Sequence, residues 1–243
     1  MNVSAIKNYP LFRTACKTLR ESIYGVLCQT PLSDNKVNFG NGTAFMIAPG
    51  ICATAAHVLH VEGNKTKPVH QRIELIRTPD IGKQMSLGRL IAEDIERDLA
   101  LIEIINPTSI ASVSLYQSKI DNGINCGSLG FPLASVITVN NQIGFNLIER
   151  FQGAYISAFR KNSQTPQALD FYETDSLMYG GSSGCPGFTT EEKVFGMHIS
   201  TVTDGVTNGN SVRLAISLWV PSMDIIKFAN DNGITNLNVQ GYE

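Results

Sequence analysis

Short runs of β-forming residues alternate with clusters of glycine, asparagine, aspartate and proline along most of this 243-residue chain. This alternation is typical of antiparallel sandwiches and barrels, because each turn cluster ends one strand and lets the next begin. We therefore expect an all-β core. The runs that we expect to form strands are 24–29, 42–48, 71–77, 85–92, 99–104, 125–130, 146–158, 169–174, 193–201 and 212–220.

Helical periodicity is confined to the two ends of the chain. Apolar residues recur at helical spacing from Leu11 to Ile23 with Lys and Arg between them, which predicts an amino-terminal helix packed on the body. Near the other end, Met223–Asn230 predicts a second helix, with Ser222 as its N-cap and Gly233 as its terminator. We expect the polar tail from residue 235 to be loosely held.

Composition excludes several classes of protein. The formal net charge is −2, which does not suit a nucleic-acid surface or a polybasic membrane patch. Met1–Pro10 contains no apolar run typical of a signal peptide, and no segment reaches the length that a membrane span needs. The five cysteines are scattered without a CxxC pair, so we expect free, mostly buried thiols and a cytoplasmic location.

One segment, 174–188, combines serines with several glycines and reads TDSLMYGGSSGCPGF. Hydrolysis of an amide by a serine nucleophile needs a base that takes the hydroxyl proton, a partner that holds the base, and N–H donors for the developing oxyanion. Ser183 suits the nucleophile. Gly181 can adopt backbone angles closed to other residues, so the N–H groups of Gly181 and Ser183 can point into one oxyanion hole.

The other two groups of a catalytic triad lie far upstream. His57 follows a run of small residues, Ala53–Ala56, that allows close packing beside a cleft, and it suits the base. Asp98 directly precedes the apolar run 99–102, so a barrel would place it half-buried, where it suits the orienting acid. Each residue alone has an ordinary structural interpretation, as a turn serine, a core histidine and a strand-start cap. Together they stand in the order His, Asp, Ser.

With these residues in order, the chain resembles the trypsin/chymotrypsin-like serine proteases, and most closely the bacterial Deg-type (high-temperature-requirement) proteases without a PDZ domain. The resemblance runs from residue 22 to about 230. The matching pieces are GTAFMI at 42–47, TAAHV at 54–58, DLALI at 98–102, GSLGFP at 127–132, TD at 174–175, GSSGCP at 181–186, FGMH at 195–198 and LAI at 214–216.

The resemblance implies two six-stranded antiparallel β-barrels with the active site between them. We assign residues 1–22 to an amino-terminal helical extension, 23–106 to a first barrel with His57 and Asp98, and 107–123 to a linker. Residues 124–220 form a second barrel with Ser183 and the pocket for the P1 side chain, the residue before the scissile bond. The last assigned segment, 221–243, is a helix and tail.

Other chemistries fit less well. Gly180–Gly184 also reads as G-x-S-x-G with Ser182 as nucleophile, but the acid and histidine of an α/β-hydrolase do not follow in order. His57 and His60 form H-x-x-H without a glutamate between them, so we expect no metal and no other cofactor. Cys185 lies two residues past the nucleophile position and reads as a small buried residue.

The resemblance also bears on activation. In the digestive branch of the family, an aspartate before the nucleophile receives a new amino terminus; here that residue is Ser182, so we expect no such switch. We also expect no appended peptide-binding domain after the final helix. Narrow specificity or a regulatory partner docked at the amino-terminal helix would then restrain the enzyme.

Specificity stays open between two preferences. His198 matches a position that lines the S1 pocket, and in glutamyl endopeptidases and picornavirus-type proteases a histidine there helps bind P1 Glu or Gln. A structural histidine on the barrel wall is an equal alternative. Met178 stands where many of those relatives have a threonine, and it favours an apolar P1. Ile199 and Ser200 belong to main chain that would pair with an extended substrate.

The sequence thus predicts a serine endopeptidase acting on polypeptides, narrow in specificity and regulated, for example in stress or defence. A catalytically silent protease-fold binding module and an esterase using the same triad are the alternatives.

Overall fold

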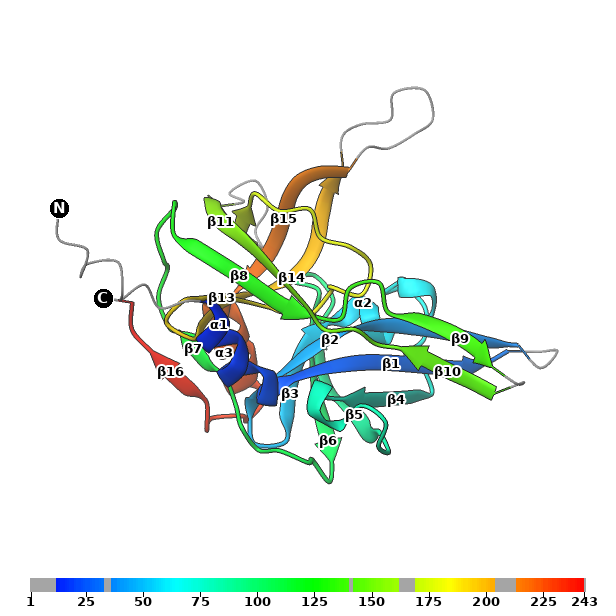
Figure 1. The fold of residues 1–243 in the computed structure, drawn as a ribbon. Coiled ribbons are helices and arrows are strands. Elements are labelled where there is room, and N and C mark those ends of the chain that lie inside the picture. The colour runs from blue at the N-terminus through cyan, green and yellow to red at the C-terminus, as the bar shows by residue number, and fades with distance from the viewer. Residues whose placement is uncertain (1–11, 33–35, 140–141, 162–168, 204–212, 243) are drawn as a thin grey trace.

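The computed structural model describes residues 12–32, 36–139, 142–161, 169–203 and 213–242. Figure 1 shows two β-barrels packed against each other, the first running from blue through cyan to blue-green and the second from green to orange. The prediction of an all-β protein with two six-stranded antiparallel barrels and short terminal helices is confirmed.

The amino-terminal barrel closes in the order β1-β2-β3-β6-β5-β4, and every pair in it is antiparallel. Its interior is apolar: Val26, Phe45 and Leu101 are completely buried. Strand β5 alternates between half-buried and exposed residues, as a strand with one face on the core and one in water does. The strands are β1 Ile23–Pro31, β2 Val37–Ala48, β3 Ile51–Ala55, β4 Arg72–Ile76, β5 Ser86–Asp94 and β6 Leu99–Ile105.

The carboxy-terminal barrel follows the order β13-β8-β11-β12-β15-β14 and closes where β13 pairs with β14. Its core is aromatic. The Phe195 ring lies between Tyr172 and Trp219, with centroids 5.4 and 5.6 Å away. The strands are β8 Asn125–Gly130, β11 Arg150–Lys161, β12 Asp170–Thr174, β13 Pro186–Thr189, β14 Lys193–Thr203 and β15 Arg213–Pro221.

Smaller elements surround the barrels. β9 (Ser135–Val139) and β10 (Gln142–Asn146) form a hairpin beside the first barrel, where the Phe145 and Phe39 rings lie 5.9 Å apart (Figure 1). Short 3₁₀ turns cover 20–22, 61–63 and 78–80, and α2 (Ala56–Leu59) carries His57.

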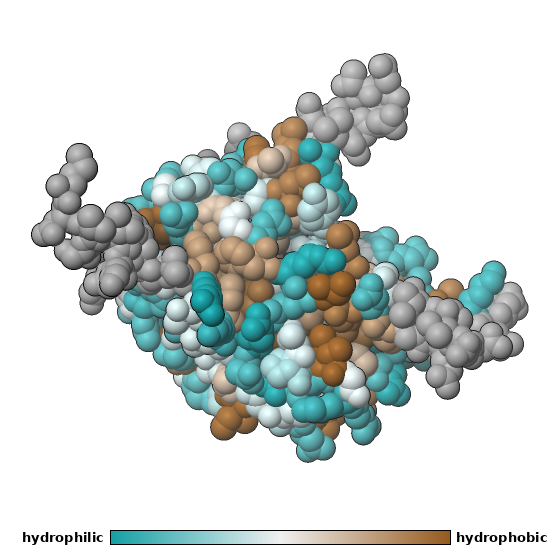
Figure 2. Space-filling view, viewed as in Figure 1, coloured by the Kyte–Doolittle hydropathy of each residue, from teal (hydrophilic) through white to brown (hydrophobic). Residues whose placement is uncertain are grey.

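The predicted amino-terminal helix is present as α1 (Phe12–Leu19), which continues into the first 3₁₀ turn. Its apolar face is used within the chain: Ala15 and Leu19 are buried, and the Phe12 ring lies 5.2 Å from Phe151 on β11. Figure 2 shows apolar side chains gathered on this face of the molecule, over β8 and β11 beside α1.

Two expectations about the carboxyl end are wrong. α3 (Ser222–Asp231) begins after Pro221, and the Ser222 hydroxyl does not cap it but donates to the Tyr116 carbonyl at 2.6 Å. The tail is not loose, because β16 (Asn238–Gln240) pairs in parallel with β7 (Ser114–Tyr116), a strand inside the segment we assigned as a linker.

The predicted helix terminator is confirmed. Gly233 has φ +82° and its N–H donates to the Asn230 carbonyl, as a left-handed residue after a helix does. Among the described helices, none is long and apolar enough to cross a membrane.

Candidate active site

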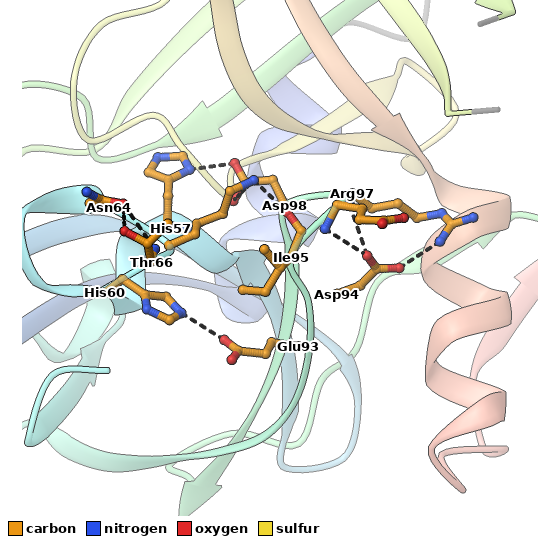
Figure 3. A network of polar contacts seen from close by, with 11 residues as sticks. His57, His60, Asn64, Thr66, Glu93, Asp94, Ile95, Arg97 and Asp98 are labelled. Atoms are coloured by element: carbon orange, nitrogen blue, oxygen red, sulfur yellow. Dashed lines mark hydrogen bonds and ion pairs between the residues drawn. The ribbon is translucent and has the colours of Figure 1, made fainter. Parts of the chain in front are cut away.

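His57 and Asp98 meet at the open end of the first barrel. His57 lies on α2 immediately after β3, and Asp98 lies immediately before β6, the strand that pairs with β3. Asp98 Oδ2 is 2.6 Å from His57 Nδ1, and Asp98 Oδ1 accepts from the His57 backbone N–H at 2.8 Å. Figure 3 shows the two side chains facing each other. The carboxylate thus fixes both the position and the rotation of the ring.

The backbone at Asp98 is unusual. Its φ is +57°, a left-handed conformation that few non-glycine residues adopt and that concentrates at functional sites. In this conformation its carbonyl accepts from the Ala56 N–H at 3.1 Å while its carboxylate reaches His57. The neighbouring Arg97 turns away to Asp94, at 2.7 Å (Figure 3).

One cation stands near the acid. The Lys65 ammonium lies 3.7 Å from Asp98 Oδ1 and donates to the Ile95 carbonyl at 2.6 Å. Asp98 itself is 8% exposed, so this charge acts on a carboxylate largely removed from water.

Ser183 comes from the other barrel, on the loop between β12 and β13, and it is tied to the first barrel through Thr43 on β2. The Thr43 N–H donates to the Ser183 carbonyl at 2.8 Å, and the Thr43 hydroxyl donates to the Gly181 carbonyl at 2.9 Å. The same hydroxyl accepts from the Phe131 N–H at 3.0 Å. Thr43 is completely buried, so it joins the two barrels at the loop.

Glycine is required on both sides of Ser183. Gly181 has φ +91°, and a Cβ there would lie 2.5 Å from the Phe131 carbonyl oxygen. Gly184 has φ +84°, and a Cβ there would lie 2.0 Å from the Thr43 carbonyl oxygen. Any side chain at either position would displace the loop.

The loop leaves two N–H groups free to bind an oxyanion. The Gly180 carbonyl accepts from Leu133 at 2.7 Å, and the Ser182 carbonyl accepts from Cys185 at 2.9 Å. Because a trans peptide directs its C=O and N–H to opposite sides, the N–H groups of Gly181 and Ser183 point away from those donors. Within the described residues, neither N–H donates to a backbone acceptor.

The residue after Ser183 packs closely against the strand that leads into His57. A Cβ atom at Gly184 would lie 3.0 Å from the backbone nitrogen of Ala55, which is two residues before His57. No hydrogen bond between the Ser183 hydroxyl and His57 occurs in the described part of the chain. Catalytic hydrogen bonds are often long in free enzymes and tighten when substrate binds.

A pocket of about 260 Å³ opens beside Ser183. Of the residues predicted for the S1 pocket, Met178, His198 and Ser200 line it, whereas Ile199 does not. Ile199 instead packs against the main apolar core.

His198 lies deep in the wall of this pocket. Its side chain lies edge-on against Trp219 with ring centroids 5.1 Å apart. Neither ring nitrogen makes a hydrogen bond of good geometry to a described residue, and the backbone at Ser182 and Ser200 only partly offsets the effect of burial on its pKa. Burial lowers the pKa of His198 to about 4, so the imidazole is neutral near pH 7. This placement fits the structural interpretation of His198 and leaves it no charge to offer a substrate.

A larger cavity of about 480 Å³ lies on the other side of the same loop. Met178 and Tyr179 line both cavities. The buried Ser182 hydroxyl, at the position of the activating aspartate in digestive relatives, has no partner in the described structure.

The rejected alternatives have structural roles. His60 is buried between the Lys67 carbonyl at 2.6 Å and Glu93 at 2.9 Å. Burial raises the pKa of the Cys185 thiol far above its usual range, so it is no thiolate nucleophile. Over the described residues, no cluster of His, Cys, Asp and Glu could hold a metal, and the cysteines are free thiols, all buried except the half-buried Cys16.

The structure brings three residues to the site to which the sequence assigned no role: Thr43, Lys65 and Arg213. Thr43 lies in the motif GTAFMI, so its neighbourhood was recognised but not its contacts. Lys65 lies in a loop and Arg213 at the start of a strand, and neither belongs to a motif. They reach the site only because chain segments far apart in the sequence pack together.

Residues 42–197 match the model of the trypsin-like peptidase domain, and the chain belongs to this family. It is 25% identical over 206 residues to the mouse (Mus musculus) serine protease HTRA4 and to the rat (Rattus norvegicus) serine protease HTR4. That alignment covers 84% of this chain but 36% of each relative, so the chain spans about a third of their length.

Among solved structures, the chain resembles the active form of the Rv3671c protease from M. tuberculosis. The TM-score is 0.65 and the sequence identity 16%, over 94% of this chain and 86% of that one. At this identity the likeness supports the two-barrel fold alone.

Proposed function

We propose that this protein is a serine endopeptidase in which His57, Asp98 and Ser183 form the catalytic triad. The 2.6 Å contact between His57 Nδ1 and Asp98 Oδ2 carries the proposal, because it leaves Nε2 of the ring free for a serine hydroxyl. The loop with Ser183, hydrogen-bonded through Thr43 to the barrel that holds this pair, supports it.

The mechanism follows from these positions. His57 takes the proton of the Ser183 hydroxyl as its oxygen attacks the scissile carbonyl. The N–H groups of Gly181 and Ser183 stabilise the oxyanion. Asp98 stabilises the imidazolium, which then gives its proton to the leaving amine. Water attacks the acyl-enzyme by the same route and releases the second product.

The test is a Ser183→Ala variant assayed on a peptide library by mass spectrometry. We expect kcat to fall by roughly 10⁴–10⁶-fold, the scale of triad deletions. A fluorophosphonate probe should label wild-type Ser183 and spare a His57→Ala variant, because the serine needs its base. Turnover retained in Ser183→Ala would refute the assignment, and a protein that is folded but unlabelled would favour the silent binding module.

An esterase with the same triad is the remaining alternative. Matched peptide and ester substrates separate the two activities, since an endopeptidase cleaves both and an esterase only the ester.

We further propose that the enzyme is narrow in specificity and regulated. The small pocket beside Ser183 supports narrow specificity. The exposed face of α1, with Arg13, Thr14, Lys17 and Thr18, is the surface we propose for a regulatory partner, because the opposite face is buried. Ready degradation of unfolded casein by the isolated protein would contradict this restraint.

A further inference from the structure

The pocket beside Ser183 has a polar wall that the sequence did not reveal. Thr201 and Thr203 on β14 and Arg213 at the start of β15 line it together with Met178. The Thr201 hydroxyl and Arg213 Nη1 both approach the Met178 carbonyl, at 3.3 and 3.4 Å. The pocket that would receive the P1 side chain is therefore bordered by hydroxyl and guanidinium donors.

Arg213 is the charged group among the described residues that line this pocket. No Asp, Glu or Lys of the described ranges lines it. All nine arginines lie within the described residues; six of them hold an ion pair with an acid, whereas Arg213 holds none with any described residue. An arginine without a carboxylate partner that faces a pocket is suited to bind a carboxylate, because its planar fork matches two oxygens.

The histidine of the pocket cannot take this role. His198 lies deeper in the wall and is neutral near pH 7. The positive potential at the pocket therefore comes from Arg213, while Thr201 and Thr203 can donate further hydrogen bonds.

We propose that the pocket selects an acidic side chain, Asp or Glu, at P1, and that Arg213 is the residue that determines this specificity. This inference rests on the proposed protease function. In this proposal Arg213, rather than His198, recognises the P1 carboxylate. Met178 forms an apolar wall beside the methylene groups of the P1 side chain.

The test uses fluorogenic peptides that differ only at P1, with Glu, Asp, Gln, Leu and Lys. We expect wild type to prefer Glu or Asp. In Arg213→Gln, kcat/KM for the acidic substrates should fall roughly 10- to 150-fold, the scale of one hydrogen bond to a charged group, with little change for Leu. Arg213→Glu should lower the acidic substrates further through like-charge repulsion. A wild-type preference for Leu, or an unchanged Glu-to-Leu ratio in Arg213→Gln, overturns the proposal.

Arg160→Gln is the matched control. Arg160 lies on β11 of the same barrel, is exposed, and does not line the pocket, so this variant removes the same charge elsewhere. The Glu-to-Leu ratio should stay at the wild-type value. An equal fall in both variants would show a general effect of net charge and would also overturn the proposal.

Binding separates this inference from the protease function. In a Ser183→Ala background, calorimetry with an uncleaved peptide should show tighter binding for P1 Glu than for P1 Leu, and loss of that difference with Arg213→Gln. If the fluorophosphonate probe fails to label wild-type Ser183 but this difference persists, the protease assignment fails and the acidic pocket stands. If labelling succeeds and the difference is absent, the acidic pocket fails alone.

Discussion

In the amino-terminal barrel, His57 and Asp98 are joined by two hydrogen bonds of 2.8 and 2.6 Å at the ends of neighbouring strands. In the carboxy-terminal barrel, Ser183 lies on a loop with cavities of about 480 and 260 Å³ on its two sides. In the first barrel, strand pairing positions His57 and Asp98. In the second barrel, a loop that is anchored to the first barrel positions Ser183.

This difference separates two tasks. The proposed proton transfer needs a base held in one orientation, and the paired ends of β3 and β6 hold the His57 ring in this way. The proposed substrate selection needs space and exposed polar groups, and the loop and the ends of β14 and β15 border a pocket with both. Thr43 joins the two arrangements, because it belongs to the first barrel and its hydrogen bonds end on the loop of the second.

The largest effect should come from the pair in the first barrel. In Asp98→Asn the ring of His57 loses the acceptor that fixes its tautomer, and we expect kcat to fall about 10⁴-fold with the fold intact. Steady-state kinetics and circular dichroism measure both. Asp94→Asn, in the same turn but paired with Arg97, is the control and should change kcat less than threefold. Equal losses would show that the turn as a whole, not the pair, matters.

His198 tests the second barrel through stability. Its pKa is about 4 when folded and about 6.5 when unfolded, so the unfolded chain binds the extra proton between these values. Wild type should therefore lose up to about 3 kcal/mol of unfolding free energy as pH falls from 6.5 to 4. His198→Gln should lack this loss, as followed by urea denaturation across that range. At pH 8 the unfolding free energies of wild type and His198→Gln should differ only through packing. If the two unfolding free energies changed in parallel at all pH values, the result would contradict a buried, neutral His198.

The link between the barrels should give a smaller effect. Thr43→Val leaves the Phe131 N–H and the Gly181 carbonyl without the hydroxyl, which should cost about 2 kcal/mol of unfolding free energy. We also expect kcat to fall about tenfold, because the loop with Ser183 loses an anchor. Thr54→Val is the control: its hydroxyl bonds the Thr43 carbonyl inside the first barrel, so stability should fall without the same loss of kcat. Matching losses of kcat would show that the anchor is not specific.

The smallest effect should come from surface charge. Arg89→Gln breaks an exposed pair with Glu103 on the first barrel, and Arg160→Gln breaks one with Glu173 on the second. Each should change the unfolding free energy by less than about 0.5 kcal/mol, because exposed ion pairs gain little in water. Thermal denaturation of both variants checks this. If only one of the two variants lost more than about 1 kcal/mol of unfolding free energy, surface charges would also distinguish the two barrels.

Strand-forming runs and the two terminal helices could be predicted because they are local patterns. β3 was missed because Ile51–Ala55 is short and rich in alanine, and its strand state comes from pairing with β2 and β6. β7 and β16 were missed because each is three residues long and gains its pairing from a distant partner. Ser222 was wrongly assigned as a cap because the Tyr116 carbonyl that takes its hydroxyl is 106 residues away.

The sequence by itself determined the class of fold, the family and the candidate triad, since these depend on residue type, order and local motif. Only the tertiary structure decided which charges reach the site. Lys65 beside Asp98, the neutral buried state of His198 and the place of the Arg213 guanidinium at the pocket, without an acid partner in the part of the chain that the structure describes, depend on distance and burial. Those quantities arise when segments far apart in the chain pack together, and Coulomb interactions and desolvation then act on what has been brought close.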